Sequence, residues 1–170
     1  MQVLHEKILK LLEKDARYSV SDMSSMLNVS EKEVKEAIEK LEKDKIICGY
    51  KTIIDWDKVN DVHVTALIEL KVIPQKNAGF EEIAETIMKM TEVESVYLMS
   101  GGFDLSVTVK GRSFKEVALF VAKRLAVMDN IESTATHFVL RRYKEIGVEM
   151  METEKDDRGA FSFWLTTMNY

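Results

Sequence analysis

The first 54 residues place apolar side chains at helical spacing in three successive segments. Apolar positions three and four residues apart, with charged residues between them, are typical of amphipathic helices that bury one face. The pattern predicts a first helix that ends near Asp15 and a third that ends near Asp44. The apolar positions of the three helices are Leu4, Ile8, Leu11 and Leu12, then Met23, Met26 and Leu27, then Val34, Ala37, Ile38 and Leu41.

Two serines mark the starts of the second and third helices. Ser19 is followed three residues later by Asp22, and Ser30 by Glu33, which is the pattern of a capping box. Only residues 28–30 separate the two helices, so the segment predicts a helix-turn-helix whose second member can enter a DNA major groove. Residues 46–54 are rich in β-branched side chains around a glycine and predict a hairpin-like wing. We therefore expect a winged helix-turn-helix over residues 1–54.

From residue 62 the apolar period changes to the alternation of β-strands. The predicted order is a strand over 62–72, a helix over 80–87, strands over 93–99 and 105–110, a helix over 114–125 and a strand over 131–143. This βαββαβ order predicts a ferredoxin-like sandwich, so the whole chain is of the α+β class. We expect a linker at 55–61, the second domain at 62–145 and a tail at 146–170, which is either a strand docked on a neighbouring subunit or a disordered end.

A sheet of this kind has helices on one face only. We expect apolar side chains on its other face, namely Leu67, Tyr97, Met99, Phe138 and Leu140. An exposed apolar face favours pairing with a second copy of the chain. Such a homodimer would set two helix-turn-helix units at a fixed separation on a pseudo-palindromic DNA site.

Charge is divided unequally between the two halves. The net charge of −5 and the pI near 5.4 argue against a protein that coats nucleic acid by bulk charge. Residues 1–54 hold ten basic and ten acidic residues, so the whole acidic excess lies in residues 55–170. The N-terminal part is therefore the one expected to meet phosphates.

Several protein classes lack support in the sequence. No apolar run approaches membrane-spanning length and no signal-peptide pattern is present, so we expect a cytoplasmic protein with no membrane partner. The single Cys48 agrees with this compartment, and the three histidines show no metal-ligand spacing. Without a phosphate loop or a nucleophile elbow, we expect no metal, no cofactor and no enzymatic activity.

Five short segments together resemble one known family. They are residues 8–12, 17–19, 27–30, 38–42 and 46–50, with the sequences ILKLL, RYS, LNVS, IEKLE and IICGY. Their combination is similar to the N-terminal pattern of the Lrp/AsnC family, the feast/famine regulatory proteins, and the similarity continues to about residue 145. The resemblance implies a DNA-binding transcriptional regulator. It also implies a C-terminal module that dimerises, assembles dimers into tetramers or octamers and binds amino acids between dimers.

The candidate residues for contact with double-stranded DNA surround the third helix. They are Arg17, Ser30, Lys32, Glu33, Lys35, Glu36, Lys43 and Lys51. We expect Lys32 and Lys35 to reach base edges or the DNA backbone, and the other basic residues to contact flanking phosphates. The alternative interpretation is that these are solvated charges that pair one helical turn apart, as in Glu31–Lys35 or Glu36–Lys40.

The sequence departs from the family pattern at two places. The third helix presents Glu33, Glu36 and Glu39 where relatives often have small polar or arginine residues, and carboxylates repel phosphates. Lys45 stands where relatives tend to have a glycine whose left-handed conformation ends the helix.

The turn at residues 100–104 resembles the effector turn of the family and suits a small ligand such as an amino acid. Glycines let backbone N–H groups approach a carboxylate, and Asp104 can accept hydrogen bonds from an ammonium group. The candidate effector residues are Ser100, Gly101, Gly102, Phe103 and Asp104, with Thr134 and Thr136 as polar neighbours. The alternative is that the glycines serve only a tight hairpin and that Asp104 braces it.

Two other functions are compatible with the sequence. The acidic third helix would suit an oligomeric small-ligand-binding protein without DNA recognition. Sirohaem decarboxylases resemble the same two-domain architecture, but such an enzyme needs basic and histidine residues around a carboxylated macrocycle. No obvious cluster of that kind stands in this sequence.

Overall fold

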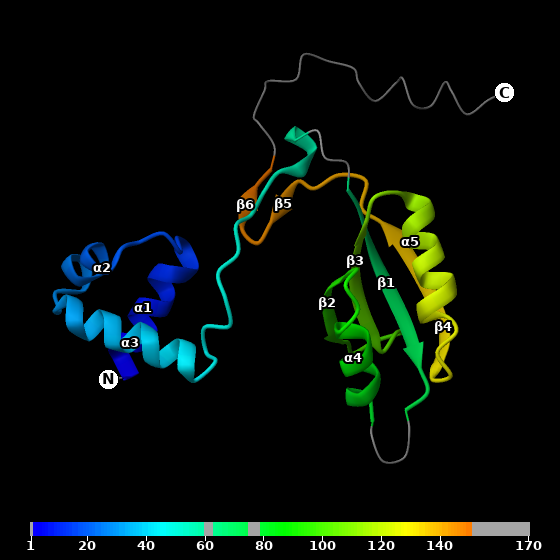
Figure 1. The fold of residues 1–170 in the computed structure, drawn as a ribbon, viewed down its shortest axis with the longest axis horizontal. Coiled ribbons are helices and arrows are strands. Elements are labelled where there is room, and N and C mark those ends of the chain that lie inside the picture. Colours follow the sequence, from blue (N-terminus) through cyan, green and yellow to red (C-terminus); the bar gives the residue numbers. More distant parts are fainter. Residues whose placement is uncertain (1, 60–62, 75–78, 151–170) are drawn as a thin grey trace. The chain divides into compact units, whose positions relative to one another are not determined.

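The computed structural model describes residues 2–59, 63–74 and 79–150. The chain divides into two compact units, Met1–Thr52 and Ile53–Tyr170, which are described separately (Figure 1). None of the helices in the described ranges combines the length and the apolar character that spanning a membrane would need.

The N-terminal unit consists of three helices. These are α1 (Gln2–Lys14), α2 (Val20–Leu27) and α3 (Glu31–Lys43), which confirms the three predicted helices and the helix-turn-helix order. The helices form because their apolar residues share one face, and they pack because those faces meet in a common core. The fully or almost fully buried residues of this core are Ile8, Met23, Val34, Ala37 and Leu41.

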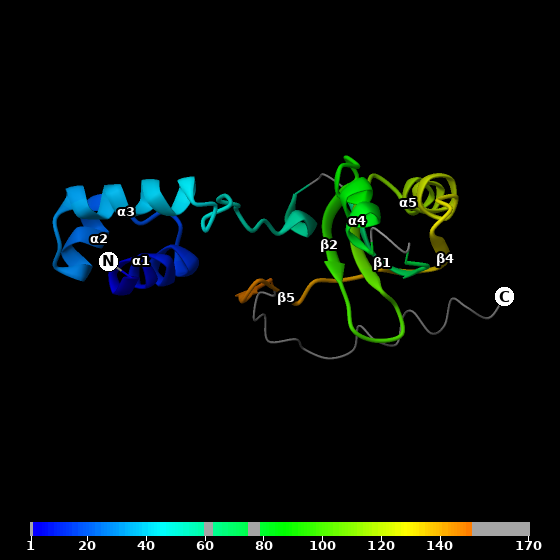
Figure 2. The same cartoon turned by 90° about the horizontal axis from the view of Figure 1, so that it is seen from below.

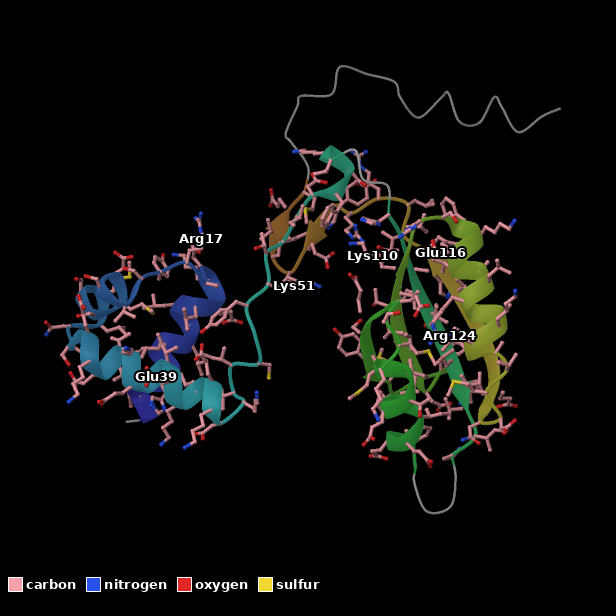
Figure 3. All side chains as sticks on the ribbon, viewed as in Figure 1. Arg17, Glu39, Lys51, Lys110, Glu116 and Arg124 are labelled. Carbon is pink, nitrogen blue, oxygen red and sulfur yellow. The ribbon has the colours of Figure 1, made fainter. Side chains whose placement is uncertain are left out.

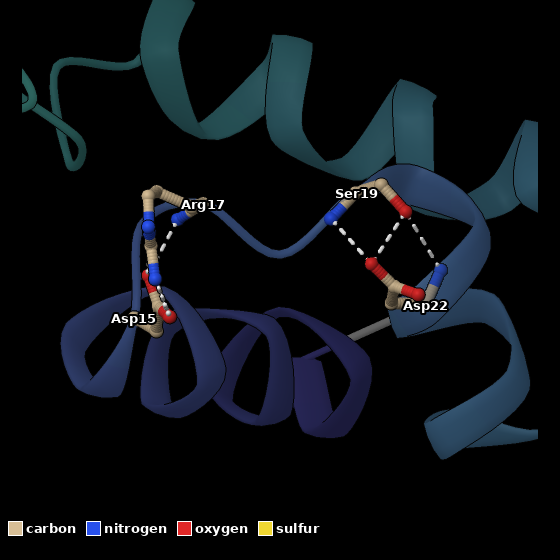
Figure 4. Close-up of polar contacts among 4 residues, drawn as sticks. All are labelled: Asp15, Arg17, Ser19 and Asp22. Atoms are coloured by element: carbon tan, nitrogen blue, oxygen red, sulfur yellow. Dashed lines mark hydrogen bonds and ion pairs between the residues drawn. The ribbon is translucent and has the colours of Figure 1, made fainter.

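Both predicted capping boxes are formed. The hydroxyl of Ser19 accepts the backbone N–H of Asp22, and the Asp22 carboxylate accepts the backbone N–H of Ser19 (Figure 4). Ser30 and Glu33 repeat the arrangement at the start of α3. Between the two helices, Asn28 ends α2 in the left-handed conformation, with a φ of 53°. The turn of the helix-turn-helix is therefore held by its own side chains and backbone.

The expected hairpin over residues 46–54 is not present, because no strand occurs between α3 and the short helix η1 (Trp56–Lys58). The backbone turns back on α3 instead. Lys45 takes the left-handed conformation with a φ of 57°, its N–H donates to the carbonyl of Glu42, and the N–H of Ile46 donates to that of Leu41. These bonds satisfy the last carbonyls of α3, as a Schellman ending does. The start of the segment is thus used to end a helix rather than to pair strands.

The C-terminal unit is built on a four-stranded antiparallel sheet in the order β2-β3-β1-β4. Its elements are β1 (Val64–Val72), α4 (Glu81–Met88), β2 (Val93–Leu98), β3 (Leu105–Gly111), α5 (Phe114–Phe120), the π-helical η2 (Val121–Leu125) and β4 (Ile131–Phe138). Both α4 and α5 lie on the same face of the sheet (Figure 2). This arrangement confirms the α+β class and the predicted βαββαβ order.

The register of β1 separates a dry face from an open face. Its even-numbered residues are all buried and contribute to the core under the helices. Phe138 lies opposite Ala66, and its ring packs edge-on against that of Phe114 in α5, with 4.8 Å between the ring centroids. Phe138 therefore faces the helices. The expectation that Phe138 lines the open face is therefore wrong, since side chains directly opposite each other across two strands share a face.

The open face is more polar than the sequence pattern suggests. Leu67 and Tyr97 lie on it, but their neighbours in register are mostly hydroxyl-bearing or charged, namely Thr65, Glu69, Lys71, Ser95, Ser106, Thr108, Lys110, Ser133 and His137. Met99 lies beyond the end of β2, and Leu140 lies beyond β4 with its side chain 88 % exposed. The expected continuous apolar face is therefore not formed within this unit.

The last predicted strand is shorter than expected. β4 ends at Phe138 rather than near residue 143, and the chain then forms a small hairpin from β5 (Lys144–Glu145) and β6 (Val148–Glu149). Ile146 and Gly147, between the two strands, both have positive φ angles of 44° and 81°, as tight two-residue hairpin turns require. The rest of the predicted tail, residues 151–170, lies outside the described residues.

Candidate DNA-binding and effector sites

The outer face of α3 carries alternating charges. Burial of Val34, Ala37 and Leu41 on the inner face turns the charged residues outward. Lys32 lies 3.9 Å from Glu36, and Lys35 lies 3.9 Å from Glu39, which Figure 3 labels. The four side chains are between 63 % and 83 % exposed, so water screens both ion pairs. The two candidate contact lysines are thus held only weakly, each by a carboxylate on the same exposed face of α3.

The pairs differ from those expected. The alternative interpretation gave Glu31–Lys35 and Glu36–Lys40 as examples of pairing one turn apart. The structure has pairs with that spacing, but each has the lysine first and the glutamate one turn later. Glu31 lies in the first turn of α3, where a carboxylate compensates the positive end of the helix dipole.

The side chains of Ser30 and Glu33 bond to each other in the capping box of α3. The Ser30 hydroxyl donates to the Glu33 carboxylate at 2.7 Å, and the backbone N–H of Ser30 donates to the same oxygen at 2.9 Å. These two hydrogen bonds, the hydroxyl first, hold the pKa of Glu33 below its ordinary value. Its negative charge therefore points back at the helix start, which reduces the repulsion that a phosphate would meet from this residue.

Arg17 lies in the loop between α1 and α2. Its backbone N–H donates to Asp15 at 2.9 Å and its Nε to the same oxygen at 3.3 Å (Figure 4). The backbone bond is the largest reason why the pKa of Asp15 is lowered. The Arg17 side chain is 91 % exposed, so the guanidinium keeps most of its donors available to a phosphate.

Lys43 and Lys51 are the two remaining candidate cations. Lys43 lies in the last turn of α3, where a positive charge favours the negative end of the helix dipole. Lys51 follows the end of α3 and is labelled in Figure 3. Neither makes an ion pair with another residue in the described ranges, so both charges are available.

The turn at residues 100–104 closes a hairpin between β2 and β3. The backbone N–H of Met99 donates to the carbonyl of Asp104 at 2.8 Å, and Gly101 has a positive φ of 156° that favours glycine. Added side-chain atoms at Gly101 or Gly102 would meet nothing within 4 Å, so the turn is open to an approaching molecule. The hairpin role expected for these glycines is thus present in the fold.

The side chain of Asp104 joins this turn to the end of β1, while its backbone carbonyl closes the turn. Its carboxylate accepts the backbone N–H of Val72 at 2.8 Å, and the Lys71 ammonium lies 3.3 Å from each carboxylate oxygen. Its own N–H donates to the carbonyl of Leu70 at 2.9 Å. The Val72 bond is the first cause that holds the pKa of Asp104 below its ordinary value, with Lys71 acting in the same direction. The side chain is therefore a fixed carboxylate.

Thr134 and Thr136 are separated from Asp104 by a strand. They lie in β4 opposite Leu70 and Ile68, on the face that the helices cover, and β1 runs between them and β3. Within one chain the turn and the two threonines therefore do not converge.

Sequence reasoning missed the partners that come from distant parts of the chain. Lys71 stands in a predicted strand, but nothing in the sequence links it to Asp104. His137, expected at a surface or interface, lies 3.1 Å from Glu69 across the open face. Its alternation with Phe138 along a predicted strand could have indicated the face, but not the partner. Within the described ranges, no three His, Cys, Asp or Glu side chains converge as a metal site would require.

Comparison with known proteins identifies both units. Residues 4–42 match the AsnC-type helix-turn-helix domain, and residues 65–148 match the Lrp/AsnC ligand binding domain. The HTH-type transcriptional regulator YugG of Bacillus subtilis is 46 % identical over 154 residues, which cover 89 % of this chain and 92 % of that protein.

Two solved structures share the fold. Escherichia coli AsnC is 22 % identical with a TM-score of 0.64, over 85 % of this chain and 95 % of its own. The transcriptional regulator NMB0573 of Neisseria meningitidis, solved as a complex with L-Met, is 22 % identical with a TM-score of 0.67, over 84 % of this chain and 91 % of its own. The two solved structures show the fold, and the family matches and YugG show the family. The chain belongs to the Lrp/AsnC family and is a DNA-binding transcriptional regulator with a ligand-binding domain.

Proposed function

We propose that the protein recognises specific DNA sequences by placing α3 in the major groove. The observation that carries this proposal is the helix-turn-helix with two complete capping boxes, which holds α3 with its charged face outward. Lys32 and Lys35 supply the contacts near its N-terminal half, while Arg17, Lys43 and Lys51 contact phosphates on either side. Because its ligand is chromosomal DNA, the protein acts in the cytoplasm.

We infer that the active species is a homodimer, which assembles into tetramers or octamers. Two α3 helices on one two-fold axis would read two half-sites of an operator. Exposed apolar side chains near the end of the described chain support association, since water contact with them is unfavourable. Leu140 is 88 % exposed and Ile146 is 81 % exposed.

We propose that a small effector with a carboxylate group, an amino acid or a similar molecule, binds at residues 100–104 and changes DNA affinity. The open glycine turn and the fixed carboxylate of Asp104 support this position. Thr134 and Thr136 lie across β1 from Asp104, and their part in the site stays a prediction.

Gel-shift measurements on the promoter region of its own gene test DNA recognition. The Lys32→Glu/Lys35→Glu double variant should lose at least about a hundredfold in affinity, because two attractive contacts become repulsive. A matched control is Lys89→Glu/Lys115→Glu, which makes the same charge change in the ligand-binding unit and should leave affinity within about threefold. Affinity should also fall as salt rises. Equal affinity of the two double variants would contradict the proposed role of α3.

A second candidate function follows from the charge of α3. The helix carries five glutamates against four lysines, and two of those lysines are already paired. An oligomeric ligand-binding protein that has lost DNA recognition would fit this balance. Selection from a library of genomic fragments separates the two: a regulator enriches specific fragments, whereas the alternative retains its ligand and enriches none.

A further inference from the structure

Lys71 forms an ion pair with Asp104, the carboxylate of the proposed effector site that could bind an ammonium group of a ligand. Its Nζ lies 3.3 Å from both oxygens of Asp104, so one lysine bridges the whole carboxylate. The two side chains are 39 % and 20 % exposed, which places the pair partly out of water and limits screening. Lys71 lies in β1, and Asp104 lies 33 positions later in the chain, directly before the neighbouring strand β3.

The Asp104 side chain cannot rotate away from Lys71 without losing the hydrogen bond that holds it to the end of β1. One oxygen accepts the Val72 N–H at 2.8 Å, the Asp104 N–H donates to Leu70, and the Asp104 carbonyl accepts from Met99. The carboxylate is therefore fixed in position and direction. An ammonium group from a ligand has to displace Lys71 or share the carboxylate with it, and two cations at that distance repel each other.

The other half of the site favours a negative ligand group. Backbone N–H groups at residues 100–103 donate no hydrogen bond to any described residue. The nearby Lys71 ammonium, 39 % exposed, adds a positive charge beside the turn, and the Asp104 carboxylate already accepts the Val72 N–H as well as this ammonium. The turn thus offers donors and a cation, but no vacant anion.

We propose that Lys71 is the specificity-determining residue of the effector site, and that it selects small carboxylates without an adjacent ammonium, such as 2-oxo acids, over the matching α-amino acids. The inference rests on the proposed effector function of residues 100–104 and defines its ligand class. Lys71 acts as a tethered substitute for the ammonium of an amino acid.

Isothermal titration of the full-length protein tests this with matched probes. The probes are the L-amino acids alanine, leucine, methionine and phenylalanine, and the four 2-oxo acids with the same side chains. The wild-type protein should bind the best 2-oxo acid about tenfold more tightly than its amino acid, since an ammonium that must displace Lys71 forfeits a charged hydrogen bond. Lys71→Met, which keeps the length but removes the charge, should reverse that preference.

Two variants make the result specific. Lys71→Arg keeps the charge and should retain the 2-oxo acid preference, which also guards against a fold defect in Lys71→Met. Lys89→Met removes an exposed lysine that is paired with Glu85 in the same unit, and it should leave the preference unchanged. If the amino acids bind the wild type as tightly as they bind Lys71→Met, the role of Lys71 is refuted while the effector site stands. If no probe binds any of the four proteins, the effector site itself is refuted, and the role of Lys71 with it.

Discussion

Polar contacts in the two units span different distances along the chain. In the N-terminal unit, the side-chain hydrogen bonds of the described residues join positions no more than eight apart, as between Tyr50 and Glu42. In the C-terminal unit, several join positions 32 to 77 apart, as between Arg124 and Glu92 or between Arg142 and Thr65. Arg124 is labelled in Figure 3.

The difference separates two ways of building a functional site. In the DNA-binding unit α2 and α3 each carry their own capping box, so the position of α3 depends on residues next to it. The proposed effector site forms only when β1 and β3 are paired, because Asp104 bonds to Val72 and Lys71 across that pair. Damage to a core should therefore dismantle the effector site, whereas damage to a cap should loosen the DNA-binding unit locally.

The largest expected effect is that of a cavity in the larger core. Ile68 is fully buried at the middle of β1, so Ile68→Ala should reduce the free energy of unfolding of the C-terminal unit by about 2–5 kcal/mol. Urea unfolding followed by circular dichroism measures this, and effector binding should weaken in parallel. Ile73→Ala makes the same change at a side chain that is 56 % exposed and should stay within about 0.5 kcal/mol. Equal losses in the two variants would show that β1 does not carry the core.

A smaller and local effect is expected at the cap of α3. Ser30→Ala removes the hydroxyl that accepts the N–H of Glu33, which should cost about 1 kcal/mol in the free energy of unfolding of the N-terminal unit. Hydrogen exchange should show faster opening in the first turn of α3 and no change in the sheet. Ser25→Ala alters an exposed serine in α2 and should not destabilise. Faster exchange in β1 would contradict the independence of the cap.

The same variant has a pH signature. Ser30 lowers the pKa of Glu33 below its ordinary value of 4.5, so the ionised cap stabilises the folded unit above that pH. The contribution is lost as the pH falls through the lowered pKa of the folded state. The stability difference between wild type and Ser30→Ala should therefore be full at neutral pH and should narrow below about pH 4. A difference that stays constant down to pH 2 would show that the charge of Glu33 plays no part.

A stabilising change is expected where α3 ends. Lys45 holds a left-handed backbone that costs a non-glycine residue energy, and its side chain makes no hydrogen bond or ion pair with the described residues that would offset this. Lys45→Gly should raise the free energy of unfolding of the N-terminal unit by somewhat less than 1 kcal/mol, roughly the strain it removes. Lys40→Gly, inside α3, should lower it by about 1 kcal/mol. If both glycines destabilise, the left-handed ending is not the controlling feature.

Local contacts were also the part of the molecule that the sequence could predict. The two capping boxes join residues three apart, so the pairs Ser19–Asp22 and Ser30–Glu33 were predictable in detail. The order of strands and helices along the second unit could be predicted from the spacing of apolar residues. A period of two indicates a strand and the helical period indicates a helix, and one segment cannot show both. The family resemblance also indicated a left-handed helix end at Lys45, where relatives tend to have glycine. Lys45 does take that conformation, with a φ of 57°.

What the sequence could not supply depends on register and on distant pairing. A shift of one residue moves a side chain to the other face, which is why Phe138 was expected on the open face although it lies opposite Ala66. The bond from Lys71 to Asp104 needs both strands in place before it can be seen. The expected hairpin after α3 did not form, because a run of β-branched residues indicates a tendency to form a strand but does not supply a partner strand.

The smallest expected effect on stability, which comes with a measurable change in DNA binding, lies on the outer face of α3. Glu39→Gln removes the carboxylate 3.9 Å from Lys35, and the free energy of unfolding should change by less than about 0.5 kcal/mol because the pair is exposed. DNA affinity should rise severalfold, since Lys35 is released and a repulsive charge is lost. Glu85→Gln breaks the comparable pair with Lys89, at 3.8 Å on α4, and should leave gel-shift affinity unchanged. Equal affinities for Glu39→Gln, Glu85→Gln and wild type would mean that this part of α3 does not face the phosphates.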